Sequence, residues 1–350
     1  MEFGLFVEFP ANSTTTQPQI FKDSMELIDA AEESGSEEVW LAEYHFNPGR
    51  SVLSAPVTVA AAIAARTKRV KIGLAVHVLP LRNPVQIAEE IATLDHLSDG
   101  RLDFGIGRAA FPRIYQGYGL NYAESRERFD ECLEIILKAW TMDKFSFHGK
   151  YYQFDEISVV PQPLQKPHPP IRIGATSTDT FELVGRMGYP IFINPSRVTN
   201  MLDLKPLVAE FHEARKKAGH TGPVDVGLRV PVYVAETKEE AYSEPKESTM
   251  FQMQRLINVI KESVGQEGIP ANDDRALQAQ RLEAMTYEDV MDNMVIHGTP
   301  ESVVERLQEL QEELGITQVI YEVNFGCSVP LEHQIKSVRL LNEKVAPNIK

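Results

Sequence analysis

The sequence is poor in cysteine, with only Cys132 and Cys327 among 350 residues. Two cysteines do not build the disulfide framework of a small secreted protein, so a reducing compartment is expected. The chain start lacks the basic and apolar stretches of a secretory signal. The longest apolar stretches, such as residues 57–65, are too short to span a bilayer. We therefore expect a cytoplasmic protein with no membrane partner.

Positive charge is also scarce. The chain has 35 Lys and Arg against 50 Asp and Glu, a formal net charge of −15. This acidic balance argues against a nucleic-acid partner, which usually requires a basic face. Apolar residues make up 43% and charged residues 24% of the chain, values that are ordinary for a globular protein. A chain of this length can bury a large core without disulfides or metals.

Several motifs of catalysis are missing. The sequence contains no H-E-x-x-H, no C-x-x-C, no nucleophile elbow and no Walker A loop. Its nine histidines are scattered, so no metal site is expected. The two cysteines fall in an expected helix and a late loop, which makes a cysteine nucleophile improbable.

What the sequence does have is a regular alternation of short apolar strands and amphipathic helices. Strands are predicted at residues 2–6, 38–42, 70–78, 102–106, 171–174, 191–194, 224–235 and 317–323. Most are followed by a helix, a pattern typical of a parallel sheet covered by helices. Eight such units predict an α/β fold of the (β/α)₈ TIM-barrel type.

No shift in composition indicates a second domain, so residues 1–350 are predicted to form a single barrel domain. Three segments exceed what the barrel needs and are predicted as insertions at its C-terminal face: residues 111–122, 145–170 and 236–293. The second is expected to hold a hairpin. The third is helical and highly charged, and insertions this long in a compact barrel are usually lids or interfaces.

Residues 105–110 read G-I-G-R-A-A and match a dinucleotide-binding pattern. The context does not fit, because Phe111 and Pro112 follow where a helix should begin. Arg108 is instead expected at the C-terminal end of a strand, where it can meet an anion. Residues 176–180 read T-S-T-D-T and open a helix, so Thr176, Ser177 and Thr180 either bind a phosphate or simply cap that helix.

Glu43, Tyr44 and His45 close the second predicted strand, and His77 closes the third. At the mouth of a barrel, such a histidine can move protons or bind a ligand. The alternative is a structural hydrogen-bonded pair, and spacing alone does not decide between the two. Aromatic and methionine side chains near the insertions are further pocket candidates: Tyr115, Tyr118, Phe192, Phe251 and Met253.

At this point the chain resembles a known family, the bacterial-luciferase-like flavin-dependent monooxygenases. The resemblance extends almost from end to end. It rests on residues 39–46 (V-W-L-A-E-Y-H-F), 73–75, 78–80, 83–85, 94–95, 100–101, 104–108 (F-G-I-G-R), 149–152, 167–170 and 298–301 (G-T-P-E). It implies a barrel that binds FMN, as FMNH₂ delivered by a separate flavin reductase, and uses O₂ through a C4a-peroxyflavin to oxidise a small organic substrate.

The resemblance also implies roles for particular residues. Arg108, Thr176, Ser177 and Thr180 would hold the FMN phosphate. The peptide between Ala75 and Val76 would be a cis bond beneath the flavin ring. Glu43, Tyr44 and His45 would be the catalytic group, although Tyr44 stands where luciferase has its catalytic histidine. A tyrosine is a poor base at neutral pH, so light emission is doubtful.

The family is commonly dimeric, and the apolar helices near residues 56–65 and 87–94 suit a homodimer. Two alternative functions stay open. Related barrels use a deazaflavin for hydride transfer, and Tyr44 leaves room for a flavin-binding protein without turnover.

Overall fold

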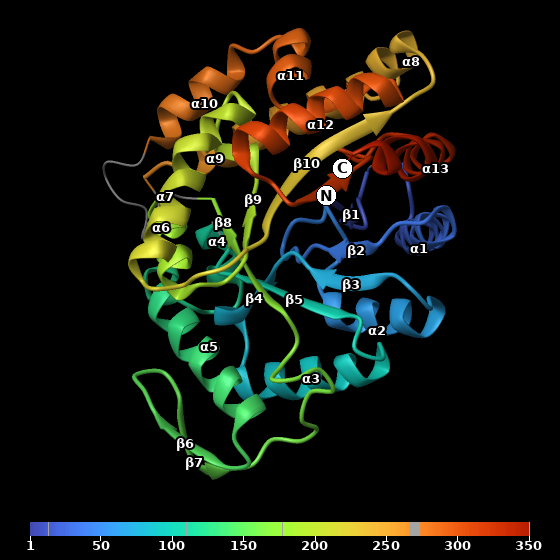
Figure 1. The fold of residues 1–350 in the computed structure, drawn as a ribbon. Coiled ribbons are helices and arrows are strands. Elements are labelled where there is room, and N and C mark those ends of the chain that lie inside the picture. The colour runs from blue at the N-terminus through green and yellow to red at the C-terminus, as the bar shows by residue number, and fades with distance from the viewer. Residues whose placement is uncertain (13, 110, 177, 266–273, 350) are drawn as a thin grey trace.

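The computed structural model describes residues 1–12, 14–109, 111–176, 178–265 and 274–349. Parallel strands form a closed ring, and helices surround it (Figure 1). Pairing of β9 with β10 joins the two ends of the strand order and closes the barrel. The predicted (β/α)₈ barrel is confirmed, which removes the dinucleotide-binding interpretation: the two glycines of that motif lie inside a barrel strand.

The ring runs in the order β1, β2, β3, β5, β8, β9, β10 and β12. These strands span Glu2–Val7, Glu38–Leu41, Lys71–Leu74, Leu102–Gly107, Ile171–Ala175, Ile191–Ile193, Val226–Val234 and Gln318–Glu322. Two short strands add to it, β4 (His77–Val78) beside β5 and β11 (Ile296–Gly298) beside β10. The single strand predicted over residues 70–78 is wrong, because the chain forms β3 and β4 with the cis Ala75–Val76 bond between them.

Within the described ranges, eight helices surround the ring of strands. They are α1 (Gln17–Ser34), α2 (Pro56–Arg66), α3 (Pro84–Leu97), α5 (Ser125–Thr141), α6 (Thr178–Met187), α7 (Lys205–Lys217), α12 (Pro300–Leu314) and α13 (Leu331–Leu340). Helix α12 shows why the sequence specifies them. Its apolar positions recur every three to four residues and are buried. Proline begins the helix, and Gly315 ends it at a φ of 65° that only glycine adopts easily.

Further elements lie between the barrel units. The first insertion holds α4 (Pro112–Gly117), and the second pairs β6 (Phe145–His148) with β7 (Gln153–Ile157) as the expected hairpin. The third holds α8 (Lys238–Ser243), α9 (Lys246–Ser263), α10 (Arg275–Glu283) and α11 (Tyr287–Asn293). Helices α9, α10 and α11 share a small apolar core of their own. Of the helices described, none is long and apolar enough to cross a membrane.

Trp40 fills much of the barrel interior, and two glycines make room for it. Its side chain is fully buried on β2, directly opposite Gly73 on β3. A Cβ at Gly73 would lie 2.0 Å from the indole ring, and one at Gly4 on β1 would lie 2.5 Å from it. Phe192 on β9 meets the indole edge-on from across the barrel, with ring centroids 4.7 Å apart. The strands can therefore close only with glycine beside this indole.

Replacing Gly73 with alanine should destabilise the barrel, because the added methyl group would overlap a ring that has no space to move. Overpacking of this kind costs about 1–3 kcal/mol or more. The matched control is Gly49→Ala, where a Cβ would meet nothing within 4 Å, and where a change within about 0.5 kcal/mol is expected. Urea unfolding of both variants measures the difference. Equal stability of the two would contradict this view of the core.

Candidate active site

A cavity of about 1060 Å³ opens at the C-terminal ends of the strands. This is where (β/α)₈ barrels place their active sites. It gathers eight of the nine residues predicted for the site: Glu43, Tyr44, His45, Ala75, Val76, Arg108, Thr176 and Thr180. Ser177 lies outside the described residues. Of the other pocket candidates, Phe192 and Met253 line the cavity, whereas Tyr115, Tyr118 and Phe251 are not among its described lining residues.

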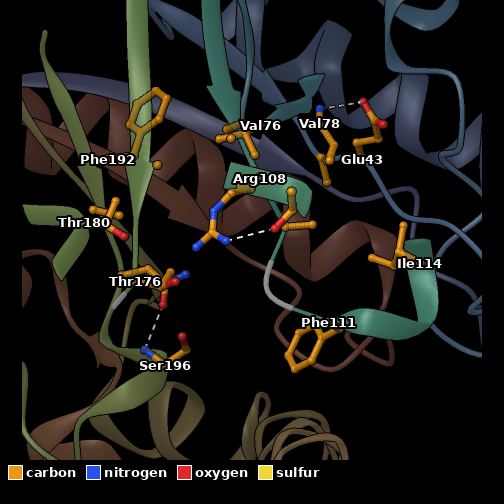
Figure 2. A pocket seen from close by; sticks show the side chains of 18 of the residues that line it. Glu43, Val76, Val78, Arg108, Phe111, Ile114, Thr176, Thr180, Phe192 and Ser196 are labelled. Atoms are coloured by element: carbon orange, nitrogen blue, oxygen red, sulfur yellow. Dashed lines mark hydrogen bonds between the residues drawn. The ribbon is translucent and has the colours of Figure 1, made fainter. Parts of the chain in front are cut away.

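Arg108 directly follows β5 and points into the cavity, with Thr176 and Thr180 on the facing wall (Figure 2). One guanidinium nitrogen donates to the Ser125 hydroxyl at 3.0 Å, and the guanidinium carbon lies 6.0 Å from the ring centroid of Tyr122. Neither contact is acidic, and no described carboxylate forms an ion pair with Arg108. The Arg108 guanidinium can therefore form an ion pair with an anion from outside the chain.

The wall facing Arg108 is the beginning of α6. Thr176 follows β8, and Thr180 lies in the first turn of the helix. The free N–H groups at a helix N-terminus favour an anion. Asp179 would oppose such an anion, but its carboxylate pairs with Arg126. The anion-binding potential of this end is therefore preserved.

Val76 forms part of the cavity floor. Gly107 on β5 and Gly174 on β8 leave the space that its side chain needs, because a Cβ at these positions would lie 2.4 Å and 3.0 Å from Val76 carbons. Ala75 and Val76 both line the cavity, and Figure 2 shows Val76 beside Arg108. The result is a floor of small apolar groups next to the anion-binding end.

Glu43 follows β2, and its carboxylate contacts two histidines, His45 and His77. Its carboxylate forms a hydrogen bond with His45 Nε2 at 2.8 Å and accepts another from the backbone N–H of Val78 at 3.3 Å. Figure 2 shows the bond from Val78. The Nδ1 atom of the fully buried His77 approaches the second oxygen to 2.8 Å, but without the alignment of a hydrogen bond. On the outer side, the exposed Tyr118 hydroxyl lies 3.0 Å from His45 Nδ1.

The electrostatics of Glu43 follow from these neighbours. Burial raises its pKa, but the charge of His77 and the hydrogen bond from His45 oppose burial and lower the pKa to about 2. Glu43 is therefore ionised and accepts only, so His45 donates from Nε2. In the neutral ring, Nδ1 then accepts from Tyr118. The three side chains form a continuous chain of hydrogen bonds between the surface and the cavity wall.

Tyr44 has a different role from the one that its position suggests. Its hydroxyl donates to Glu8 at 3.0 Å and receives Arg50 at 3.1 Å, so its proton is directed away from the cavity. Burial, the largest influence, raises the pKa of Tyr44 to about 12. The expectation that Tyr44 belongs to the catalytic group thus gains no support from its contacts, which are structural.

Glu8 and Tyr44 are part of a buried charge cluster that the sequence analysis missed. Arg50 and Arg229 both pair with Glu8, and Arg229 also pairs with Glu322 at 2.5 Å. Arg229 further stacks over the ring of Phe6, with 4.1 Å from guanidinium carbon to ring centroid. A signal existed: Arg229 is the one charged residue in the apolar strand at residues 226–234, where an inward-facing charge needs a partner.

The fold and the site define the class of protein. It is a (β/α)₈-barrel enzyme with a large cavity at the C-terminal ends of its strands. The chain belongs to the luciferase-like monooxygenase family, whose model matches residues 1–318. This confirms the family and the enzyme class predicted from the sequence.

Individual relatives agree. The chain is 28% identical over 348 residues to a flavin-dependent trigonelline monooxygenase, oxygenase component, of Acinetobacter baylyi, covering 98% of this chain and 94% of the relative. It is 27% identical to an FMNH₂-dependent dimethylsulfone monooxygenase of Pseudomonas putida, over 84% of this chain and 80% of the relative. The solved structure of monooxygenase RslO1 from Streptomyces bottropensis matches 99% of both chains with a TM-score of 0.82 and 25% identity.

Replacing Glu43 with glutamine should destabilise the protein by about 1–3 kcal/mol at pH 7, because a buried ionised acceptor is lost to its partners. The folded-state pKa of about 2 lies below the ordinary value of 4.5, so the stabilisation is complete above pH 4.5 and is lost as the pH falls toward 2. Urea unfolding at pH 7 and at pH 3 should show the gap between wild type and variant narrowing in acid. Glu26→Gln, at an exposed position on α1, is the control, and a gap independent of pH would contradict the argument.

Proposed function

We propose that this protein is an FMN-dependent monooxygenase, which takes FMNH₂ from a separate flavin reductase and oxidises a small organic substrate with O₂. The observation that carries the proposal is that two anion-favouring groups line one end of the cavity: the Arg108 guanidinium, which forms no ion pair with a described carboxylate, and the N-terminus of α6. Family membership and the FMNH₂-dependent relative support the same cofactor.

The cavity residues fit FMN at three points. Arg108, Thr176 and Thr180 offer a cation and two hydroxyls to the phosphate, and we extend this role to Ser177 from the sequence alone. The floor at Ala75 and Val76 suits a flat ring. The volume of about 1060 Å³ is at the upper end for ligand pockets, which leaves space for a substrate beside the cofactor.

When bound, reduced FMN would supply the two electrons that activate O₂, and O₂ would be the source of the transferred oxygen atom. The chain's own residues bind, orient and shield. The apolar floor and walls exclude water. His45 lies on the cavity wall between the ionised Glu43 and the exposed Tyr118, so it can hold or pass a proton beside the substrate. Tyr44, hydrogen-bonded to Glu8 and Arg50, fixes the wall behind His45.

The reductase partner follows from the proposed chemistry, because no second flavin or nicotinamide motif is evident in the chain. The relative described as an oxygenase component supports a separate reductase. We also propose a homodimer, since Val57 and Ala61, one turn apart on the same side of α2, are partly exposed apolar residues.

The test is a substrate screen in which a reductase regenerates FMNH₂ under ¹⁸O₂. Substrate-dependent oxygen uptake with ¹⁸O in an organic product is expected. Hydride transfer from a reduced deazaflavin without ¹⁸O incorporation would replace the proposal with the deazaflavin alternative. Flavin binding with no product from any substrate would instead favour a binding protein without turnover.

Arg108→Ala should weaken reduced-FMN binding by about tenfold or more, because a charge-assisted contact to the phosphate is lost. Anaerobic titration of each variant with FMNH₂ gives the affinity. Arg186→Ala is the matched control, since Arg186 lies exposed on α6 and pairs with Glu182 at 2.8 Å, outside the cavity. Unchanged affinity in the Arg108 variant would remove the phosphate site from this end.

His45→Gln should lower kcat by about 10²-fold or more, the usual contribution of a proton-transferring side chain. Tyr44→Phe should lower kcat by less than about tenfold, because its hydroxyl serves Glu8 rather than the substrate. Steady-state turnover of a substrate found in the screen compares the two variants. If Tyr44→Phe impaired turnover as much as His45→Gln, the roles assigned to the two residues would be wrong.

A further inference from the structure

A second cation on the cavity wall lacks an acidic partner. Arg255 belongs to α9, is half-buried and lines the cavity. Its Nη1 lies 3.6 Å from the sulfur of the buried Cys327, and its guanidinium carbon lies 5.5 Å from the ring centroid of Phe251. Within the described ranges, no carboxylate forms an ion pair with it. A charge that is partly removed from water is costly without a counter-charge, so an anion from elsewhere would be favoured here.

The neighbouring cations are already balanced. Cys327 lies between Arg255 and Arg50, since its thiol approaches the Arg50 carbonyl oxygen at 3.7 Å. Arg50 and Arg229 pair with the buried carboxylates of Glu8 and Glu322. Arg255 therefore adds a positive charge that this cluster does not neutralise. The chain as a whole has a net charge of −15, which repels anions. A local positive charge of this kind attracts an anionic ligand in spite of that repulsion.

The position of Arg255 separates it from the phosphate end. Its contact Cys327 follows β12, whereas Arg108 follows β5. In the closed ring, β12 and β5 are four strands apart in either direction, on opposite sides of the mouth. Arg113 also lines the cavity, but it lies on α4, directly after β5 and so close to Arg108 in the chain. The mouth thus has two cationic ends that face each other.

Apolar side chains form part of the cavity lining on the Arg255 side. Met253 on the same helix is buried, and Phe325 follows β12; both line the cavity. A ligand held here would present a negatively charged group to the guanidinium and an apolar body to these side chains.

We propose that the substrate is a small organic acid, whose carboxylate pairs with Arg255 while its apolar skeleton packs on Met253 and Phe325. This assignment rests on the proposed function, because it gives the Arg108 end to the cofactor. Arg255 is then a specificity-determining residue: it selects acids over neutral analogues of the same shape.

The test uses ligand pairs that differ only in charge, benzoate with benzamide and cyclohexanecarboxylate with cyclohexanecarboxamide. Isothermal titration calorimetry measures their affinities for the chain with and without oxidised FMN. Wild type should bind the carboxylates about tenfold more tightly than the amides. Arg255→Gln should lose this preference, and Arg255→Lys should keep part of it. Arg281→Gln, at an exposed site on α10 outside the cavity, should keep all of it.

Wild type that binds no carboxylate, or shows no preference for one, overturns the inference, as does an unchanged preference in Arg255→Gln. The FMN affinity of Arg255→Gln separates the two proposals. It should equal that of wild type, and a tenfold loss would assign Arg255 to the cofactor and also overturn the inference. Failure of the wild type to bind FMN would count against the proposed function alone, because the carboxylate preference is measured without FMN as well.

Discussion

The parallel pairing of β9 with β10 is the constraint on which the rest of the structure depends, because it closes the sheet into a ring. Closure directs every C-terminal strand end to one mouth. Residues that lie far apart in the chain, such as Glu43, Arg108 and Thr176, come to line a single cavity only for this reason. Closure also requires an interior that fits, which Trp40 provides between glycines on the two neighbouring strands.

Around that mouth, the distribution of paired and unpaired charge separates structure from function. Arg50 and Arg229 form ion pairs with the buried carboxylates of Glu8 and Glu322, so they stabilise the wall. Burial and the charge of Glu8 raise the pKa of Glu322 to about 7, even though the two arginines oppose the shift. Arg108 and Arg255 form no ion pair with a carboxylate among the described residues. Two anionic ligands, one at each end of the cavity, would neutralise the charges of Arg108 and Arg255.

The sequence was sufficient for the fold because local signals agree with it. Apolar periodicity, the proline at the start of α12 and Gly315 at its end all predict the same element. The sequence was also sufficient to predict that the site residues lie together, since the strand ends of one barrel share a face.

The sequence was not sufficient to predict contacts between residues that lie far apart in the chain. The hydroxyl of Tyr44 donates a hydrogen bond to Glu8, which is 36 residues away in the sequence. Arg229 pairs with the same carboxylate although 221 residues separate the two in the sequence. Spacing within a motif cannot reveal either contact. The division of the strand at residues 70–78 was missed because Ala75 and Val76, where it divides, are apolar residues that give no turn signal.

The central claim is that the two unpaired cations serve different ligands, the cofactor phosphate at Arg108 and the substrate at Arg255. The structure of the complex with FMN tests it most directly, because the phosphorus position is unambiguous in an electron-density map. The account predicts the phosphate within hydrogen-bond distance of the Arg108 guanidinium and the Thr176 and Thr180 hydroxyls, with Arg255 free of the cofactor. A phosphate bound at Arg255 would contradict it.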